Sequence, residues 1–168
     1  MNINWYPGHM AKAKQMMHEN LKLVDMVIEL VDARAPMSSS NPDLQKLYSN
    51  KIRVIILNKN DYADSKKTAL WIDYFAKQKT NVFPINALDN KEIRYVKNKL
   101  FEIAKEKSDD IKKRKGINKT IRAMVVGIPN VGKSTFINSI AGKAKAKTGD
   151  RPGVTKAKQW VKIAPLFE

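Results

Sequence analysis

The sequence contains no cysteine and only two histidines, His9 and His18, among its 168 residues. The absence of cysteine excludes disulfides, thiolate metal sites and cysteine nucleophiles, and two histidines are too few for a histidine-rich metal site. The sequence also has no apolar run of about 18 residues and no signal-peptide pattern at its start. We therefore expect a cytoplasmic protein with no membrane partner.

Acidic residues are scarce: 16 Asp and Glu face 32 Lys and Arg, which gives a formal net charge of +16. This charge is well above the roughly 2 to 8 units that keep a small domain soluble. It predicts a polyanionic partner, because basic side chains release counterions when they contact dense phosphate charge. RNA, DNA, a nucleotide and an anionic membrane surface all carry such charge. The length suits one globular domain and is too short for two ordinary ones.

Buried strands alternate with helical patterns along the chain. Runs rich in β-branched residues predict strands at residues 26–31, 52–57, 82–85, 121–126 and 160–163. Helical periodicity between them predicts helices at residues 10–24, 42–48, 66–77, 92–105 and 133–140. This alternation favours an α/β fold with three layers, in which a mostly parallel sheet is covered on both faces.

Basic residues gather in two segments. Residues 108–119 include Lys112-Lys113-Arg114-Lys115-Gly116 and have no apolar period, so we interpret them as an exposed connector between residues 1–107 and 120–168. The second cluster consists of Lys143, Lys145, Lys147, Arg151, Lys156, Lys158 and Lys162. A charged run is usually a solvated face, and contact with folded RNA is the alternative.

Residues 127–134 match the phosphate-loop pattern G-x-x-x-x-G-K-[ST] between a predicted strand and a predicted helix. Gly127 and Gly132 allow the backbone to wrap a β-phosphate with its amides. Lys133 offers a positive charge to the β- and γ-phosphates, and the Ser134 hydroxyl can bind Mg²⁺. A glycine turn that merely caps a helix is the less favoured alternative, because all four fixed positions are in register.

A second motif, Asn58-Lys59-Asn60-Asp61, follows the predicted strand at residues 52–57. The Asp61 carboxylate can accept hydrogen bonds from both N1–H and the exocyclic amine of guanine, whereas adenine offers neither donor there, which gives strong selectivity. Asn58 can contact the Hoogsteen edge or brace the phosphate loop, and the stem of Lys59 can cover the base. Taken alone, the motif is equally consistent with a plain turn after a strand.

The two motifs occur in rotated order, because ordinary GTPases place the phosphate loop first. With the start Trp5-Tyr6-Pro7-Gly8-His9-Met10-Ala11-Lys12-Ala13 and the run Val31-Asp32-Ala33-Arg34-Ala35-Pro36, nearly the whole chain resembles the circularly permuted GTPases. The resemblance implies a Ras-like P-loop GTPase domain entered at a different strand. It also implies GTP hydrolysis to GDP and phosphate, and association with the assembling large ribosomal subunit and its ribosomal RNA.

The resemblance also assigns roles to individual residues. Those implied to contact the nucleotide are Asn58, Lys59, Asp61, Asn86, Ala87, Gly127, Asn130, Val131, Gly132, Lys133, Ser134 and Thr135. Backbone amides at Asn86 and Ala87 would meet the guanine oxygen. Thr155 would close over the γ-phosphate and, with Ser134, complete the Mg²⁺ shell. Asn130 resembles the residue that binds K⁺ in potassium-activated GTPases, and bracing of the loop is its alternative role.

The chain departs from the family at its C-terminal end. The family's D-x-x-G motif should follow the predicted strand at residues 160–163 after a short turn and another strand, but the sequence there is Ala164-Pro165-Leu166-Phe167-Glu168. Our hypothesis is that a stretch is missing between Ala164 and Pro165. The helical C-terminal domain of the family also has no counterpart in these residues.

These observations predict a GTP-binding and GTP-hydrolysing assembly factor for the large ribosomal subunit, expected to be a monomer and slow without ribosomal activation. Its nucleotide state would switch its affinity for ribosomal RNA. Lys133 and Thr155 are the expected catalytic residues. His9 either positions or deprotonates the attacking water or belongs to an N-terminal turn. The alternatives are an RNA-binding protein that uses nucleotide as a structural ligand, and a P-loop ATPase or kinase.

Overall fold

The computed structural model describes residues 7–40, 46–47, 49–128, 131–142 and 161–168. In chain order the elements are α1 (Pro7–Leu21), β1 (Met26–Asp32), α2 (Pro36–Ser39), β2 (Ile52–Asn58), the short helix η1 (Asn60–Tyr62), α4 (Ser65–Lys77), β3 (Asn81–Pro84), α5 (Asn90–Lys115), β4 (Ala123–Val126) and α6 (Lys133–Ala141). The strands form a parallel sheet in the order β3-β2-β1-β4. The predicted α/β class is confirmed.

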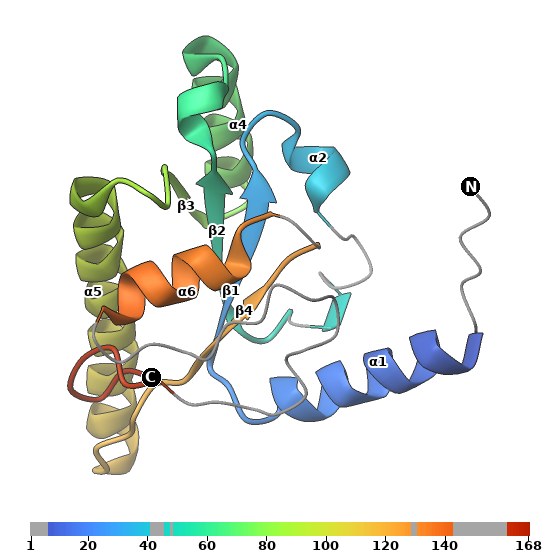
Figure 1. The fold of residues 1–168 in the computed structure, drawn as a ribbon. Helices are drawn as coiled ribbons and strands as arrows, with labels where there is room; N and C mark the ends of the chain where they lie inside the picture. The colour runs from blue at the N-terminus through green and yellow to red at the C-terminus, as the bar shows by residue number, and fades with distance from the viewer. Residues whose placement is uncertain (1–6, 41–45, 48, 129–130, 143–160) are drawn as a thin grey trace.

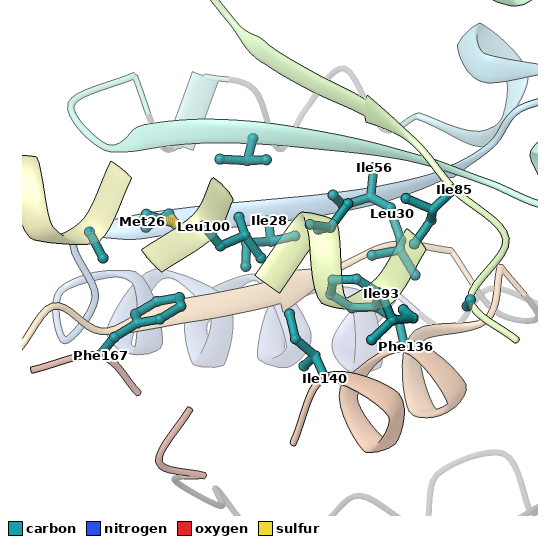
Figure 2. Close-up of a cluster of buried hydrophobic side chains, with 14 of the residues drawn as sticks. Met26, Ile28, Leu30, Ile56, Ile85, Ile93, Leu100, Phe136, Ile140 and Phe167 are labelled. Atoms are coloured by element: carbon teal, nitrogen blue, oxygen red, sulfur yellow. The ribbon is translucent and has the colours of Figure 1, made fainter. Parts of the chain in front are cut away.

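Helices cover both faces of this sheet (Figure 1). The core under α5 and α6 combines alternate residues of β1 with residues of the two helices: Met26, Ile28, Leu30, Ile93, Leu100, Phe136 and Ile140 (Figure 2). On the opposite face Val27 packs with Leu21 at the end of α1, and Val31 packs with Phe75 of α4. Successive residues of β1 therefore serve two cores, which gives the three layers expected.

The strand register gathers the loops of interest at one edge of the sheet. Asp32 of β1 lies opposite Asn58 of β2, and Leu57 lies opposite Pro84 near the end of β3. Because all four strands run parallel, the segments after β2, β3 and β4 leave the sheet at the same edge. This edge is where open parallel sheets place their ligands.

Helix α5 is longer than predicted, and the expected connector at residues 108–119 is helical as far as Lys115. Charged residues such as Lys, Arg and Glu are good helix formers, and Ile111 packs against the core. The hydroxyl of Ser108 donates to the carbonyl of Lys119 at 2.9 Å. The helix ends at Gly116, whose φ of 70° is left-handed, and the basic residues of its last turn suit the helix dipole.

Other predicted elements match in part. β4 begins at Ala123, and Ile121 forms an isolated bridge with Phe167. The strand predicted at residues 160–163 is not formed over residues 161–163, and Trp160 lies outside the described residues. Much of the helix predicted at residues 42–48 also lies outside them. No helix in the described part of the chain is long and apolar enough to span a membrane.

The C-terminal segment corrects the hypothesis of a missing stretch between Ala164 and Pro165. The amide of Phe167 donates to the carbonyl of Ala164 at 3.0 Å, which closes a tight turn. After this turn, Glu168 accepts a hydrogen bond from Ala123 at 2.8 Å, and Ile121 donates to Leu166 at 2.9 Å. The residues after the turn thus already pair with the outer edge of β4, where the expected second strand belongs, so no additional stretch is needed at this join.

Candidate nucleotide-binding site

The side chain of Asn58 joins the phosphate loop to the loop after β3. Asn58 ends β2 and is only 3% exposed. Its Nδ2 donates to the carbonyl of Val131 at 2.9 Å, and its Oδ1 accepts from the amide of Ala87 at 3.1 Å. The hydrogen bond to Val131 is the contact that a bracing role requires. Segments far apart in the sequence are thereby held at one edge of the sheet.

Both glycines of the phosphate loop occupy places that exclude a side chain. Gly132 has a φ of +98°, and a Cβ there would lie 2.5 Å from Nδ2 of Asn58. A Cβ on Gly127 would lie 2.8 Å from the carbonyl oxygen of Leu30. The close approach therefore requires glycine at each position. Residues 129–130, including Asn130, lie outside the described residues.

Helix α6 begins at Lys133 and has no side-chain cap at Gly132. Amides in such a first turn are suited to bind an anion. The Lys133 ammonium donates to the carbonyl of Gly127 at 2.5 Å, and burial lowers the pKa of Lys133. A phosphate at this position would favour the charged form of Lys133, because it would supply a negative partner.

Ser134 and Thr135 are exposed in the first turn of α6. Hydroxyl oxygens suit Mg²⁺, which prefers oxygen ligands and usually keeps waters and substrate phosphates in its shell. Among the described residues, no group of three His, Asp or Glu could hold a metal ion. The donor set at this helix therefore fits a cation that arrives with a phosphate ligand.

The base motif forms a tight turn after β2. Lys59 has a left-handed φ of 60°, and the amide of Asn60 donates to the carbonyl of Ile85 at 3.0 Å. The turn is thereby tied to the end of β3. Asp61 is exposed in η1, and the described residues give its carboxylate no hydrogen-bond or ion-pair partner. Its acceptor atoms remain available to a ligand.

The amides predicted to meet the guanine oxygen have internal partners in this structure. The amide of Asn86 donates to Oε2 of Glu92 at 2.5 Å, and that of Ala87 donates to Asn58. The Ser139 hydroxyl of α6 donates to the carbonyl of Ala87 at 3.0 Å. Sequence reasoning missed Glu92 and Ser139. The spacing from Asp89 to Glu92 resembles a capping box and could have suggested Glu92, whereas no pattern marks Ser139.

A further pair, Asp32 and Arg34, lies at the same end of the sheet, opposite Asn58, and was given no role in the sequence analysis. Asp32 ends β1, and its carboxylate accepts from Nε of Arg34 at 2.9 Å and from Nη2 at 2.6 Å. These hydrogen bonds hold the pKa of Asp32 below its usual value. An acidic residue at the carboxyl end of a parallel strand was the available signal.

The described residues do not test the roles predicted for His9 and Thr155. Thr155 lies outside the described residues. His9 belongs to the first turn of α1, and Figure 1 shows this end of the helix projecting away from the sheet and from α6. A catalytic role for either residue stays a prediction.

Comparison with known proteins agrees with the fold. A family model described as 50S ribosome-binding GTPase matches residues 122–166, which contain the phosphate loop. The parallel sheet, the phosphate loop before α6 and the base motif after β2 define a P-loop GTPase domain. Because the base motif precedes the phosphate loop in the chain, the domain is circularly permuted.

Curated relatives cover the entire chain. Ribosome biogenesis GTPase A of Priestia megaterium is 50% identical over 170 residues, covering 100% of this chain and 59% of that protein. The protein of the same name from Bacillus licheniformis is 49% identical over 168 residues, with 100% and 59% covered. The chain is a homologue of the ribosome biogenesis GTPase A proteins, and it spans about 59% of the length of these relatives.

A solved structure shows the same arrangement. The crystal structure of GNP-bound YlqF from Thermotoga maritima superposes with a TM-score of 0.58 at 34% sequence identity. The match covers 80% of this chain and 49% of that one.

Proposed function

We propose that this chain binds GTP with Mg²⁺ and hydrolyses it slowly, as the GTPase domain of an assembly factor for the large ribosomal subunit. The observation that carries this proposal is the pair of hydrogen bonds made by Asn58, which brings Val131 of the phosphate loop and Ala87 of the base-side loop to one residue. Asp61 lies three residues further along the chain with its carboxylate exposed. A nucleotide needs both halves of such a site at once.

The guanine base would be recognised by Asp61, whose carboxylate accepts hydrogen bonds from N1–H and the exocyclic amine. The stem of Lys59 would cover one face of the ring. The amides of Asn86 and Ala87 would reach the guanine oxygen only after exchanging their present partners, Glu92 and Asn58. Adenine would leave the Asp61 carboxylate unpaired, so we expect selectivity for guanine.

The triphosphate would occupy the loop from Gly127 to the first turn of α6. Its amides and the ammonium of Lys133 would neutralise the β- and γ-phosphates, and Lys133 would leave the carbonyl of Gly127 to do so. Ser134 and Thr155 would hold Mg²⁺, which supplies charge neutralisation at the phosphate oxygens. We further propose Asn130 as the site of K⁺.

Hydrolysis would depend on positioning and electrostatics, since phosphoryl transfer requires little covalent chemistry from the protein. Lys133 would stabilise the charge that develops on the leaving phosphate oxygen. Thr155 would close over the γ-phosphate. A water-positioning role for His9 would require the first turn of α1 to approach the phosphate loop.

We propose that the partner is a precursor of the large ribosomal subunit, bound in the cytoplasm by a monomer through ribosomal RNA. The relatives named ribosome biogenesis GTPase A support this assignment, and the net charge of +16 suits an RNA surface. The nucleotide state would change the affinity for RNA if GTP and GDP favour different conformations. Residues 1–168 would form a single domain, with the base-recognition half at 1–107 and the phosphate half at 120–168.

Single-turnover decay of GTP tests this proposal, measured with and without large-subunit precursors and with ATP as competitor. We expect slow decay alone, faster decay with the precursors, and no competition by ATP at a similar concentration. Asp61→Asn is the control and should lose the preference for guanine. Binding without decay would favour the structural-ligand alternative. Equal competition by ATP would favour an ATPase or kinase.

A further inference from the structure

The carboxylate of Asp32 contacts two cations at the carboxyl end of β1. Arg34 donates to it from its amide and Nε, both at 2.9 Å, and from Nη2 at 2.6 Å. The ammonium of Lys59 lies 3.8 Å from Oδ2. Asp32 therefore makes an ion pair with a residue of the base motif, although it lies on a different strand.

Both cations connect Asp32 to the residues around Asp61. Lys59 precedes the short helix η1, which contains Asp61 and Tyr62. The guanidinium of Arg34 lies over the ring of Tyr62, 6.0 Å from its centroid, at a distance typical of a cation–π contact. One carboxylate thus contacts Lys59 of the base motif and also the guanidinium that lies over Tyr62, the residue directly after the motif.

Partial burial and opposite charge both favour the ion pair between Asp32 and Lys59. The side chain of Asp32 is 18% exposed, and that of Lys59 is 33% exposed. The hydrogen bonds from Arg34 keep the pKa of Asp32 low, so the carboxylate is ionised at neutral pH. A half-buried lysine with such a partner has fewer conformations available than a fully solvated one.

We propose that Asp32 is a positioning residue of the nucleotide site, which orients Lys59 so that its stem lies over the purine ring. This inference rests on the proposed function. Preorganisation of Lys59 would reduce the entropy lost when nucleotide binds. Because the effect concerns the base and not the phosphates, GTP and GDP should be affected equally.

The first test compares Asp32→Asn with Asp25→Asn by calorimetric titration with GDP and with the GTP analogue GNP. Asp25 is a matched control, because it precedes the opposite end of β1, forms an ion pair with Lys119, and has a side chain that is 14% exposed. We expect Asp32→Asn to weaken both affinities by the same factor, about 2- to 10-fold. Asp25→Asn should bind both nucleotides like the wild type.

The second test asks whether the effect passes through Lys59. Lys59→Met keeps the aliphatic stem and removes the ammonium, so Asp32→Asn should weaken binding little further in that background. Two results would overturn the inference while leaving the proposed function intact. The first is that Asp32→Asn weakens binding by the same factor in the wild type and in Lys59→Met. The second is that Asp32→Asn alone binds nucleotide as tightly as Asp25→Asn does. A wild-type chain that binds neither nucleotide would overturn the proposed function and this inference with it.

Discussion

The space beside Gly132 is occupied by the side chain of Asn58, and this contact distinguishes Gly132 from the other described glycines with positive φ. Gly116 has a φ of +70° but no atom within 4 Å of its missing Cβ, whereas Nδ2 of Asn58 lies 2.5 Å from the missing Cβ of Gly132. Asn58 cannot move without cost, because hydrogen bonds to Val131 and Ala87 hold it at both ends.

Gly132→Ala should therefore be more harmful than Gly116→Ala. Both substitutions place alanine in the left-handed region, at φ 98° and ψ 25° for Gly132 and φ 70° and ψ 10° for Gly116, which costs about 1–2 kcal/mol. Gly132→Ala also disturbs the hydrogen bonds of Asn58, which adds about 1–3 kcal/mol. Urea unfolding measures both losses of stability. Equal losses would contradict the bracing role of Asn58.

The role of a site residue could be predicted from the sequence only where that role depends on residues close to it in the chain. Gly132 and Lys133 belong to a contiguous loop whose spacing follows from the shape of a phosphate. For Asn58 the sequence left two roles open, because the choice depends on a carbonyl at Val131, far along the chain. The contact of Ser139 with Ala87 is likewise long-range and has no local pattern.

At the scale of elements, α5 differs most from its prediction: a helix was predicted at residues 92–105, and the structure has one at Asn90–Lys115. The stripe Leu100, Ala104, Ser108 and Ile111 continues the helical spacing into the supposed connector. Because Ser108 is polar and its neighbours are charged, the sequence pattern did not show that the helix continues here. The hydroxyl of Ser108 is buried because it donates to the carbonyl of Lys119, a pairing that periodicity alone does not predict.

Two isoleucines near the end of α5 test its extent. Ile111 packs against the core from within the helix, whereas Ile117 follows Gly116 and is 53% exposed. We expect Ile111→Ala to lower the free energy of unfolding by about 1–2 kcal/mol, because it is partly buried. Ile117→Ala should change it by less than about 0.5 kcal/mol. If thermal and urea unfolding show the two variants equally stable, residues 108–115 are a connector after all.

At the scale of the whole molecule, the strand order explains how a rotated sequence builds one site. β1 lies between β2, which carries the base motif, and β4, which leads into the phosphate loop. The alternation of strands and helices predicted a parallel sheet but not which strands are neighbours, because neighbours depend on pairing across long connections. Although the two motifs occur in a different order along the chain from that of ordinary GTPases, this strand order brings their loops to the same edge of the sheet.

The crystal structure of this chain with bound GDP tests the central claim most directly. The account predicts guanine N1 and the exocyclic amine within hydrogen-bond distance of the Asp61 carboxylate. It also predicts the β-phosphate against the amides at the start of α6, with the Lys133 ammonium moved from the carbonyl of Gly127 to the phosphate. A GDP molecule that contacts the phosphate loop but not Asp61, or Asp61 but not the loop, would contradict it.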